Sequence, residues 1–275
     1  NGKKTYESIE IPKNLNETVM QTIASKNKEE LKMRTWAFAK RTTKEILRDP
    51  INIIFGLGFP IVILLLLTTI QKNIPATPFS LKQLTPGIAV FGLSFLSLFS
   101  ATLISRDRMS SLLARLFTTP MTAKDYILGY TLPLIPMALI QTLLCYLAAF
   151  CLGLKITPDV IIAILCTIPI SIIFIAIGLF CGTIFNDRQV GGICGALLTN
   201  LTAWLSGTWF SLDLIGGLFK DIAYCFPFVH AVDMARDGLN ANYHAMPNNL
   251  FWVLSYAGLL LIAAVSLFKY KMKHN

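Results

Sequence analysis

The acids and histidines that could do chemistry in this chain gather in one stretch, residues 213–249. They are Asp213, His230, Asp233, Asp237 and His244. A carboxylate and an imidazole can exchange protons with a substrate, so this set would suit an integral membrane enzyme that modifies lipids. No catalytic motif accompanies it, because the chain has no G-x-x-x-x-G-K-S/T, H-E-x-x-H or G-x-S-x-G pattern. The sequence therefore predicts no catalytic residue and no metal site, and the enzyme stays as the alternative from another class.

The segments around this stretch belong in a membrane. Of the residues, 54% are hydrophobic and only 14% are charged, a balance that the core of a soluble domain does not need. Six segments carry no charged residue and no histidine, and about 20 apolar residues suffice to cross a bilayer. They lie near residues 51–70, 86–105, 126–152, 160–184, 190–212 and 250–268. The sequence predicts an all-α, polytopic membrane protein with six transmembrane helices.

Lysines and arginines predict the orientation of these helices, because they concentrate on the cytoplasmic side of a membrane. If the first span leaves the cytoplasm, most of the 24 basic residues fall on the inner side. Those left in the outer loops are Lys72, Lys82, Lys155, Lys220 and Arg236. Both termini are therefore expected in the cytoplasm, with the chain in a cell (plasma) membrane. The net charge of +9 suits anionic lipid, and nucleic-acid binding is not expected.

The chain divides into three parts. Residues 1–27 form a polar N-terminal lead. Residues 28–49 set apolar side chains among Lys and Arg, which predicts a helix along the inner headgroups with Trp36 at the interface. A merely solvated basic helix is the alternative there. Residues 50–275 form the six-span domain.

The basic segment at residues 106–125 joins spans 2 and 3. It combines apolar residues at helical spacing, a basic residue on the other side and a stop signal before proline. These features are carried by Leu113, Leu116, Phe117, Arg115, Thr119 and Pro120. Such an amphipathic helix either rests on the lipid headgroups or docks a soluble partner and moves spans 2 and 3.

Polar residues inside the spans have two interpretations. Ser94 and Ser97 share one face of span 2, and Thr199 and Asn200 lie in span 5. They line a substrate path, or they hold helices together by hydrogen bonds. For a single hydroxyl the second role is the commoner one, so Asn200 is the better path candidate.

Residues 213–249 are too long for a hairpin connection and half apolar. This mixture predicts two short re-entrant helices that meet at Pro227, shielded by neighbouring helices in the outer leaflet. An ordinary exposed loop is the alternative. Pro227, His230, Asp233 and Arg236 are the candidate functional residues of this segment.

No acidic residue lies within a predicted span. Proton- and sodium-coupled carriers need ionisable groups at membrane depth, so the chain is not expected to be one. If it moves a substrate, the energy must come from another chain.

Two motifs resemble those of a known family. The first is Arg106-Asp107-Arg108 at the end of a span, followed by Leu113, Leu116, Thr119-Pro120 and the span opening at 123–129. The second is Phe226-Pro227-Phe228, with 231–233 and 235–237 before the last span. Together they resemble the signatures of type 2 ABC exporter permeases over roughly residue 28 to the C-terminus.

The resemblance implies a homodimer, or a pair with a second permease, in which each half docks a separate ABC ATP-binding subunit. ATP and magnesium would bind to that subunit and no cofactor to this chain. Residues 28–49 would be the connecting helix, and the coupling residues would be Arg106, Asp107, Arg108, Leu113, Arg115, Leu116, Phe117, Thr119 and Pro120. The implied function is outward movement of an amphipathic drug, lipid or peptide-like substrate across a bacterial cell membrane. A polysaccharide or teichoic-acid-type exporter is the alternative within the family, and a non-transporting membrane sensor is a third reading.

Overall fold

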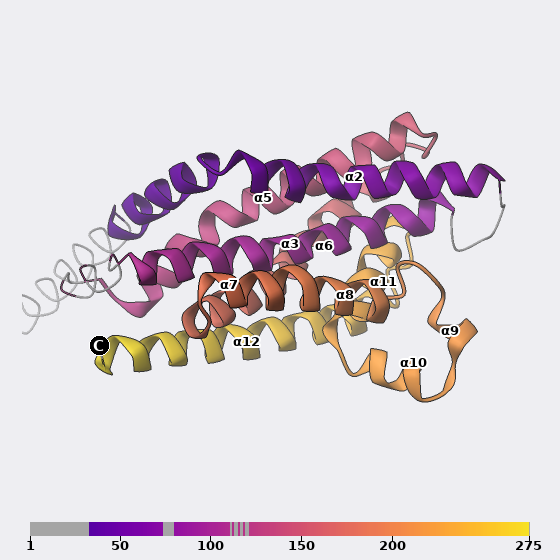
Figure 1. Cartoon of the computed structure of the whole chain (residues 1–275). Helices are drawn as coiled ribbons and strands as arrows, with labels where there is room; N and C mark the ends of the chain where they lie inside the picture. Colours follow the sequence, from indigo (N-terminus) through magenta and orange to yellow (C-terminus); the bar gives the residue numbers. More distant parts are fainter. Residues whose placement is uncertain are drawn as a thin grey trace, which may run out of the picture.

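A computed structural model describes residues 33–73, 80–110, 112, 115, 118 and 121–274. In these ranges every regular element is a helix, so the prediction of an all-α membrane protein is confirmed (Figure 1). A first helix covers residues 33–47. The others are α2 (Pro50–Asn73), α3 (Leu81–Met109), α5 (Ala123–Cys151), α6 (Asp159–Ile184), α7 (Asp187–Val190), the π-helix η2 (Gly191–Leu198), α8 (Thr199–Leu205), α9 (Leu212–Ile215), α10 (Gly217–Tyr224), α11 (Pro227–Leu239) and α12 (Met246–His274).

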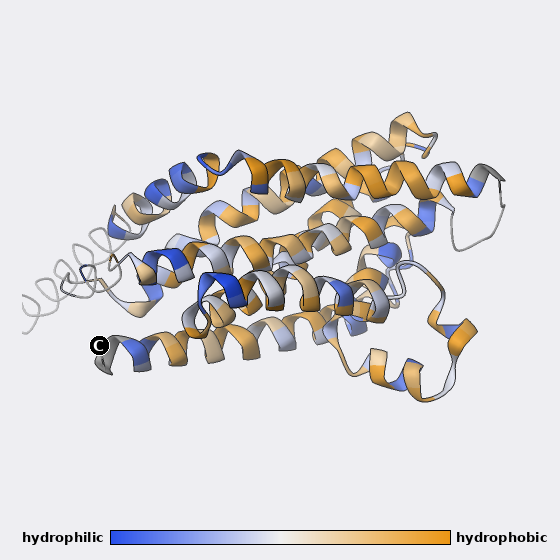
Figure 2. Ribbon diagram, in the orientation of Figure 1, coloured by the Kyte–Doolittle hydropathy of each residue, from blue (hydrophilic) through white to orange (hydrophobic). Residues whose placement is uncertain are grey.

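Five of these helices, α2, α3, α5, α6 and α12, are long and apolar enough to cross a membrane. They lie side by side, with apolar residues along most of their length (Figure 2). Helix 33–47, the end of α3, the start of α5 and the end of α12 share one end of the bundle, which we call the inner end (Figure 1). Helices α9 and α10 lie at the opposite, outer end.

Helix α3 forms the centre of the bundle, because nearly all its side chains from Leu84 to Ser105 are buried. It packs most closely on α6, where glycines face its backbone. A Cβ added at Gly178 would lie 2.3 Å from the Ser97 carbonyl oxygen, and one at Gly182 would lie 2.5 Å from the Ala101 carbonyl oxygen. Small residues in membrane helices permit such close approach. These two glycines therefore fix the distance between α3 and α6.

The segment predicted as the fifth span, residues 190–212, is interrupted. Helices α7, η2 and α8 run on from Asp187 and end at Leu205, before the predicted end at residue 212. Gly207 then takes a left-handed conformation (φ +66°), and its carbonyl oxygen accepts a hydrogen bond from Arg236 at 2.8 Å. The helical run is about 28 Å long at 1.5 Å per residue, close to the hydrocarbon thickness of about 30 Å. A sixth crossing at this place stays a prediction.

The outer segment contains three short helices, α9, α10 and α11, and not the two that the sequence predicts. Pro227 occupies the first turn of α11, where proline is tolerated because the missing N–H would be unpaired anyway. Most residues of α11 are buried, and the helix packs against α6, α12 and α3. Helix α11 is thus built into the outer end of the bundle, whereas most residues of α9 and α10 are exposed or only partly buried.

Candidate functional site

The inner end is held together by Asp107, whose side chain is almost fully buried. Its two carboxylate oxygens accept hydrogen bonds from the two terminal nitrogens of Arg41, each at 2.5 Å. The hydroxyl of Tyr130 donates a third, at 2.7 Å. Burial alone would lower the pKa of Arg41, but the hydrogen bond and the charge of Asp107 outweigh it, and this pKa is raised. A two-pronged pair of this kind is among the strong hydrogen-bonded contacts in proteins.

The arginines on either side of Asp107 reach other helices. Arg106 lies 3.1 Å from the carboxylate of Asp49, which follows helix 33–47, and 3.8 Å from that of Asp187 in α7. Arg108 donates to the carbonyl oxygens of Thr183 and Phe185 at the end of α6, at 2.5 and 2.6 Å. A cation at a helix C-terminus satisfies free carbonyls and opposes the helix dipole. The three residues thus join helix 33–47, α3, α6 and α7.

Helix 33–47 is anchored to α5 as well. The Thr35 hydroxyl donates to Asp125 at 2.7 Å, and Asp125 forms a capping box with Thr122 at the start of α5. Phe38 contacts Tyr126 and Tyr130 edge to face, with ring centroids 5.5 and 5.0 Å apart. We call this set of contacts around Asp107 the inner junction. Helix 33–47 is therefore tied to the inner ends of both α3 and α5.

The sequence identified only part of the inner junction. Arg106, Asp107 and Arg108 were predicted to couple to a partner protein, but Asp107 is committed to contacts within the chain. Arg115 is exposed. The other predicted coupling residues, Leu113, Leu116, Phe117, Thr119 and Pro120, lie outside the described residues. Sequence reasoning missed Arg41 and Tyr130, although a carboxylate at the end of a span signals that a basic partner is needed.

An aromatic groove of about 690 Å³ opens between α2, α3 and α8. Its lining is Phe55, Phe59, Ile63, Phe91, Phe95, Gly195, Thr199, Asn200, Ala203, Trp204, Trp209 and Phe210. The rings contact one another. The ring centroid of Phe91 lies 5.3 Å from that of Trp209 and 6.0 Å from that of Phe95, and both pairs are edge to face. Such a surface binds apolar or aromatic groups.

The four predicted path residues do not meet in this groove. Thr199 and Asn200 line it, whereas Ser94 and Ser97 are fully buried in α3. The two serine hydroxyls donate to backbone carbonyls of their own helix, at 2.6 and 2.7 Å. The two serines therefore act within the packed core, and of the four predicted path residues only those of α8 reach the groove.

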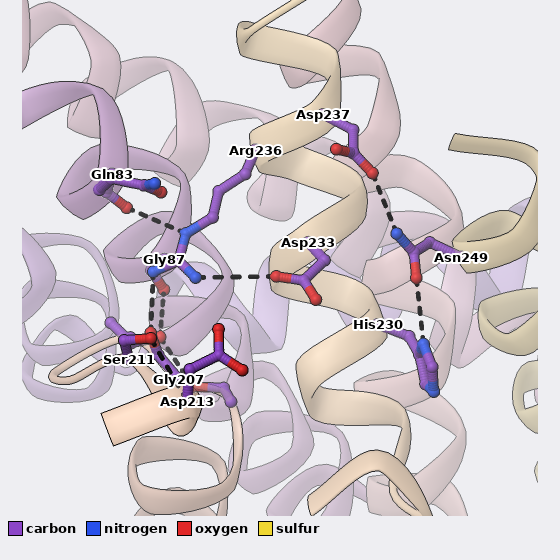
Figure 3. A network of polar contacts seen from close by, with 12 residues as sticks. Gln83, Gly87, Gly207, Ser211, Asp213, His230, Asp233, Arg236, Asp237 and Asn249 are labelled. Carbon is purple, nitrogen blue, oxygen red and sulfur yellow. Dashed lines mark hydrogen bonds and ion pairs between the residues drawn. The ribbon is translucent and has the colours of Figure 1, made fainter. Parts of the chain in front are cut away.

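The outer end contains a second cavity, of about 550 Å³, lined by polar side chains of α9, α10, α11 and α12. Arg236 closes one wall, donating to the carbonyl oxygens of Gln83 and Gly207 at 3.3 and 2.8 Å (Figure 3). Asp233 lies 3.7 Å from Arg236. Burial raises the pKa of Asp233, and the charge of Arg236 only partly offsets this. Phe210 lines both this outer cavity and the aromatic groove, so one short segment separates them.

His230 and Asp237, which the sequence marks as able to do chemistry, are joined in one hydrogen-bonded chain. Asn249 of α12 donates to Asp237 at 3.0 Å, and its amide oxygen lies 3.1 Å from Nδ1 of His230 (Figure 3). The ring of His230 stacks on Trp252 with centroids 5.0 Å apart. Pro227 lies at the start of the same helix. Sequence reasoning missed Asn249 and Trp252, which belong to helix α12.

These features were compared with known proteins. Residues 33–240 match a family described as ABC-2 type transporter. The matched range runs from helix 33–47 to the end of α11 and includes the inner junction, the aromatic groove and most of the outer cavity. A search of curated proteins found no significant match.

Proposed function

The chain belongs to the ABC-2 type transporter family, and we propose that it is the permease subunit of an exporter that moves amphipathic molecules outward. Members of this family are transport permeases that usually pair with an ATP-binding subunit. The observation that carries the substrate class is the aromatic groove. Its lining offers many rings and few polar groups, which are the side chains of Thr199 and Asn200 and the indole N–H groups of Trp204 and Trp209. A sugar chain can stack on aromatic rings, but its many hydroxyls also need hydrogen-bonding groups. This lining offers few of them, which favours a drug-like, lipid-like or apolar peptide substrate over a polysaccharide.

The inner junction supports a route for the power stroke. An ATP-binding subunit, holding ATP and magnesium, would dock on residues 106–125 and helix 33–47. Because Arg41, Asp107 and Tyr130 tie this helix to α3 and α5, a push on it moves the inner ends of both spans together. Rigid-body movement of packed helices is a common way to open and close a binding site.

A second permease would cover the groove. The face of α2 next to it exposes large apolar side chains, among them Phe55, Val62 and Leu66. In one copy the groove is open on this side, so a second copy, or a related permease, would enclose a path between two facing grooves.

The orientation proposed here places both termini in the cytoplasm of a bacterial cell. Lys155 and Arg188 are exposed near opposite ends of α6. In a cysteine-free background, Lys155→Cys should react with a membrane-impermeant thiol reagent added to intact cells, and Arg188→Cys should react only after the cells are opened. The opposite pattern would overturn the proposed orientation.

Transport is tested in inside-out vesicles that contain the chain and its ATP-binding subunit. We expect ATP-dependent uptake of a fluorescent amphipathic dye such as Hoechst 33342. Phe55→Ala, in the groove, should reduce uptake about tenfold, because Phe55 is 59% exposed there and supplies binding surface without supporting the core. The matched control is Phe251→Ala, since Phe251 is 68% exposed on α12 and lies outside the groove. Equal uptake by both variants would remove the groove from the substrate path.

A further inference from the structure

The orientation of Asn249 is fixed by Asp237. The amide nitrogen of Asn249 donates to a carboxylate oxygen of Asp237 at 3.0 Å. An ionised carboxylate can only accept hydrogen bonds, so a turned amide would set oxygen against oxygen. The amide oxygen of Asn249 must therefore face the other way, toward His230 (Figure 3).

Both ring nitrogens of His230 consequently face acceptors. Nδ1 lies 3.1 Å from the amide oxygen of Asn249, and Nε2 lies 3.1 Å from the backbone carbonyl oxygen of Tyr224. Neither oxygen carries a hydrogen, so each contact requires an N–H on the ring. A neutral imidazole has only one N–H. With 4% of its surface exposed, His230 has little access to water as a substitute partner.

We propose that His230, Asn249 and Asp237 form a proton-binding site at the outer end of the bundle, which is complete only when the imidazole carries both protons. The ligand is a proton from the outer solution, which reaches the site through the outer cavity that Asn249 and Asp237 line. When the proton leaves to water, the bare Nδ1 lone pair faces the amide oxygen of Asn249. One of the three contacts must then break.

Several charged and titratable groups surround this site. Asp233 and Arg236 lie on the same helix as His230, and Asp233 interacts electrostatically with His230. The groups that neighbouring elements bring near the site are Asp213 of α9, Tyr224 of α10 and Cys166 of α6. Helix α12 contributes Asn249 and Trp252, whose ring lies parallel to the imidazole at 5.0 Å. An aromatic face stabilises a cation held against it, so this stacking also favours the doubly protonated ring.

The bound proton joins three helices. His230 and Asp237 belong to α11, Asn249 to the first turn of α12, and the Tyr224 carbonyl to the end of α10. Loss of the proton would break one of these links and loosen the outer ends of the helices that it joins. This proton-binding site does not depend on which substrate the protein moves.

The stacked indole reports the protonation state directly, because a protonated imidazole quenches the fluorescence of a tryptophan in contact with it. We would keep Trp252 as the single tryptophan, with Trp36→Phe, Trp204→Phe and Trp209→Phe, and place the full chain in lipid nanodiscs. Its fluorescence should rise with increasing pH, because loss of the second ring proton removes the quencher. His230→Gln should abolish this rise.

Asp237→Asn makes the decisive test. The new amide can donate to the oxygen of Asn249, which can then turn its nitrogen toward Nδ1 and complete the chain with a neutral ring. The pH midpoint of the fluorescence change should fall by at least one unit, which corresponds to a tenfold lower affinity for the proton.

The matched control is Asp233→Asn, which removes a carboxylate that acts on His230 by charge but does not bond Asn249. It should shift the midpoint by less than half as much. A single-tryptophan protein whose fluorescence ignores pH, or an Asp237→Asn shift no larger than that of Asp233→Asn, would overturn the proposal.

Discussion

The two ends of the bundle each hold a carboxylate among packed helices, and they satisfy it by different means. At the inner end Asp107 accepts directly from a guanidinium and a phenol, those of Arg41 and Tyr130. At the outer end Asp237 accepts from the neutral amides of Asn242 and Asn249, each at 3.0 Å. Asp107 is thus in direct contact with a positively charged side chain. Among the described residues, Asp237 is linked by hydrogen bonds to His230 only through the amide of Asn249.

This difference assigns different properties to the two ends. An arginine stays charged at any physiological pH, so the Arg41–Asp107 pair is a permanent link that can carry force. Removing one partner of such a pair leaves an uncompensated buried charge. The hydrogen-bonded chain from Asp237 through Asn249 to His230 is weaker. All its hydrogen bonds form only when the imidazole carries both protons. The inner end is therefore suited to transmit force between helices, and the outer end is suited to change its contacts with pH.

The largest effect is expected from Arg41→Ala. Asp107 would keep only the Tyr130 hydroxyl, and stranding its charge should cost about 3 kcal/mol of stability. Thermal unfolding in detergent measures this loss, and transport coupled to ATP should fall with it. Arg41→Lys keeps the charge but cannot form the bidentate pair, so its stability should lie between that of Arg41→Ala and that of the wild type. If Arg41→Ala is as stable as the wild type, the Arg41–Asp107 pair contributes nothing to stability, and the inner end has no stronger link than the outer end.

An intermediate effect is expected from Asn249→Ala at the outer end. The substitution breaks the contacts to His230 and Asp237, which should cost about 1–2 kcal/mol. Because deprotonation of His230 breaks one contact in the wild type as well, the loss should be larger at a pH where the imidazole is doubly protonated than at a pH where it is neutral. Unfolding at both pH values measures the difference. An equal loss at the two would mean that the outer end is as insensitive to protons as the inner end.

Much of the architecture was predictable because it follows from uninterrupted apolar runs. The cores of α2, α3, α5, α6 and α12 coincide with segments that contain no charged residue. The end of the fifth predicted span was not predictable in this way. Residues 206–212 are as apolar as a span, but Gly207 turns the chain and Arg236 binds its carbonyl oxygen. Such a break depends on a side chain from another helix, which periodicity does not reveal.

The candidate sites show the same limit. The residues 106–108 stood out because charges at the end of a span are unusual, yet the partner of Asp107 lies 66 positions away. His230 and Asp237 were recognised as able to do chemistry, while Asn249, which links them, is an ordinary polar residue at a helix start. Sequence patterns identify the unusual residue, and only the fold identifies what it contacts.

A smaller effect is expected from Tyr130→Phe at the inner end. Asp107 would keep both bonds from Arg41 and lose one hydroxyl donor, which should cost about 1 kcal/mol. The loss should be the same at these two pH values, in contrast to Asn249→Ala. Parallel unfolding curves of the two variants provide the measurement, and a marked pH dependence of the Tyr130→Phe loss would contradict the permanent link.

The smallest effect is expected from Asp233→Asn, and it has the opposite sign. Burial raises the pKa of Asp233 in the folded protein, with the charge of Arg236 acting against it, whereas an unfolded chain ionises aspartate near pH 3.9. The folded state therefore favours the protonated acid, and this contribution to stability is present below about pH 3.9 and is lost as the pH rises through the folded pKa. An asparagine carries no charge to bury, so the variant should match the wild type at pH 4 and exceed it at pH 7, by less than about 1 kcal/mol. Unfolding at the two pH values decides the sign: a variant less stable than the wild type at pH 7 would mean that the contact with Arg236, 3.7 Å away, outweighs burial and that the outer end also depends on a direct ion pair.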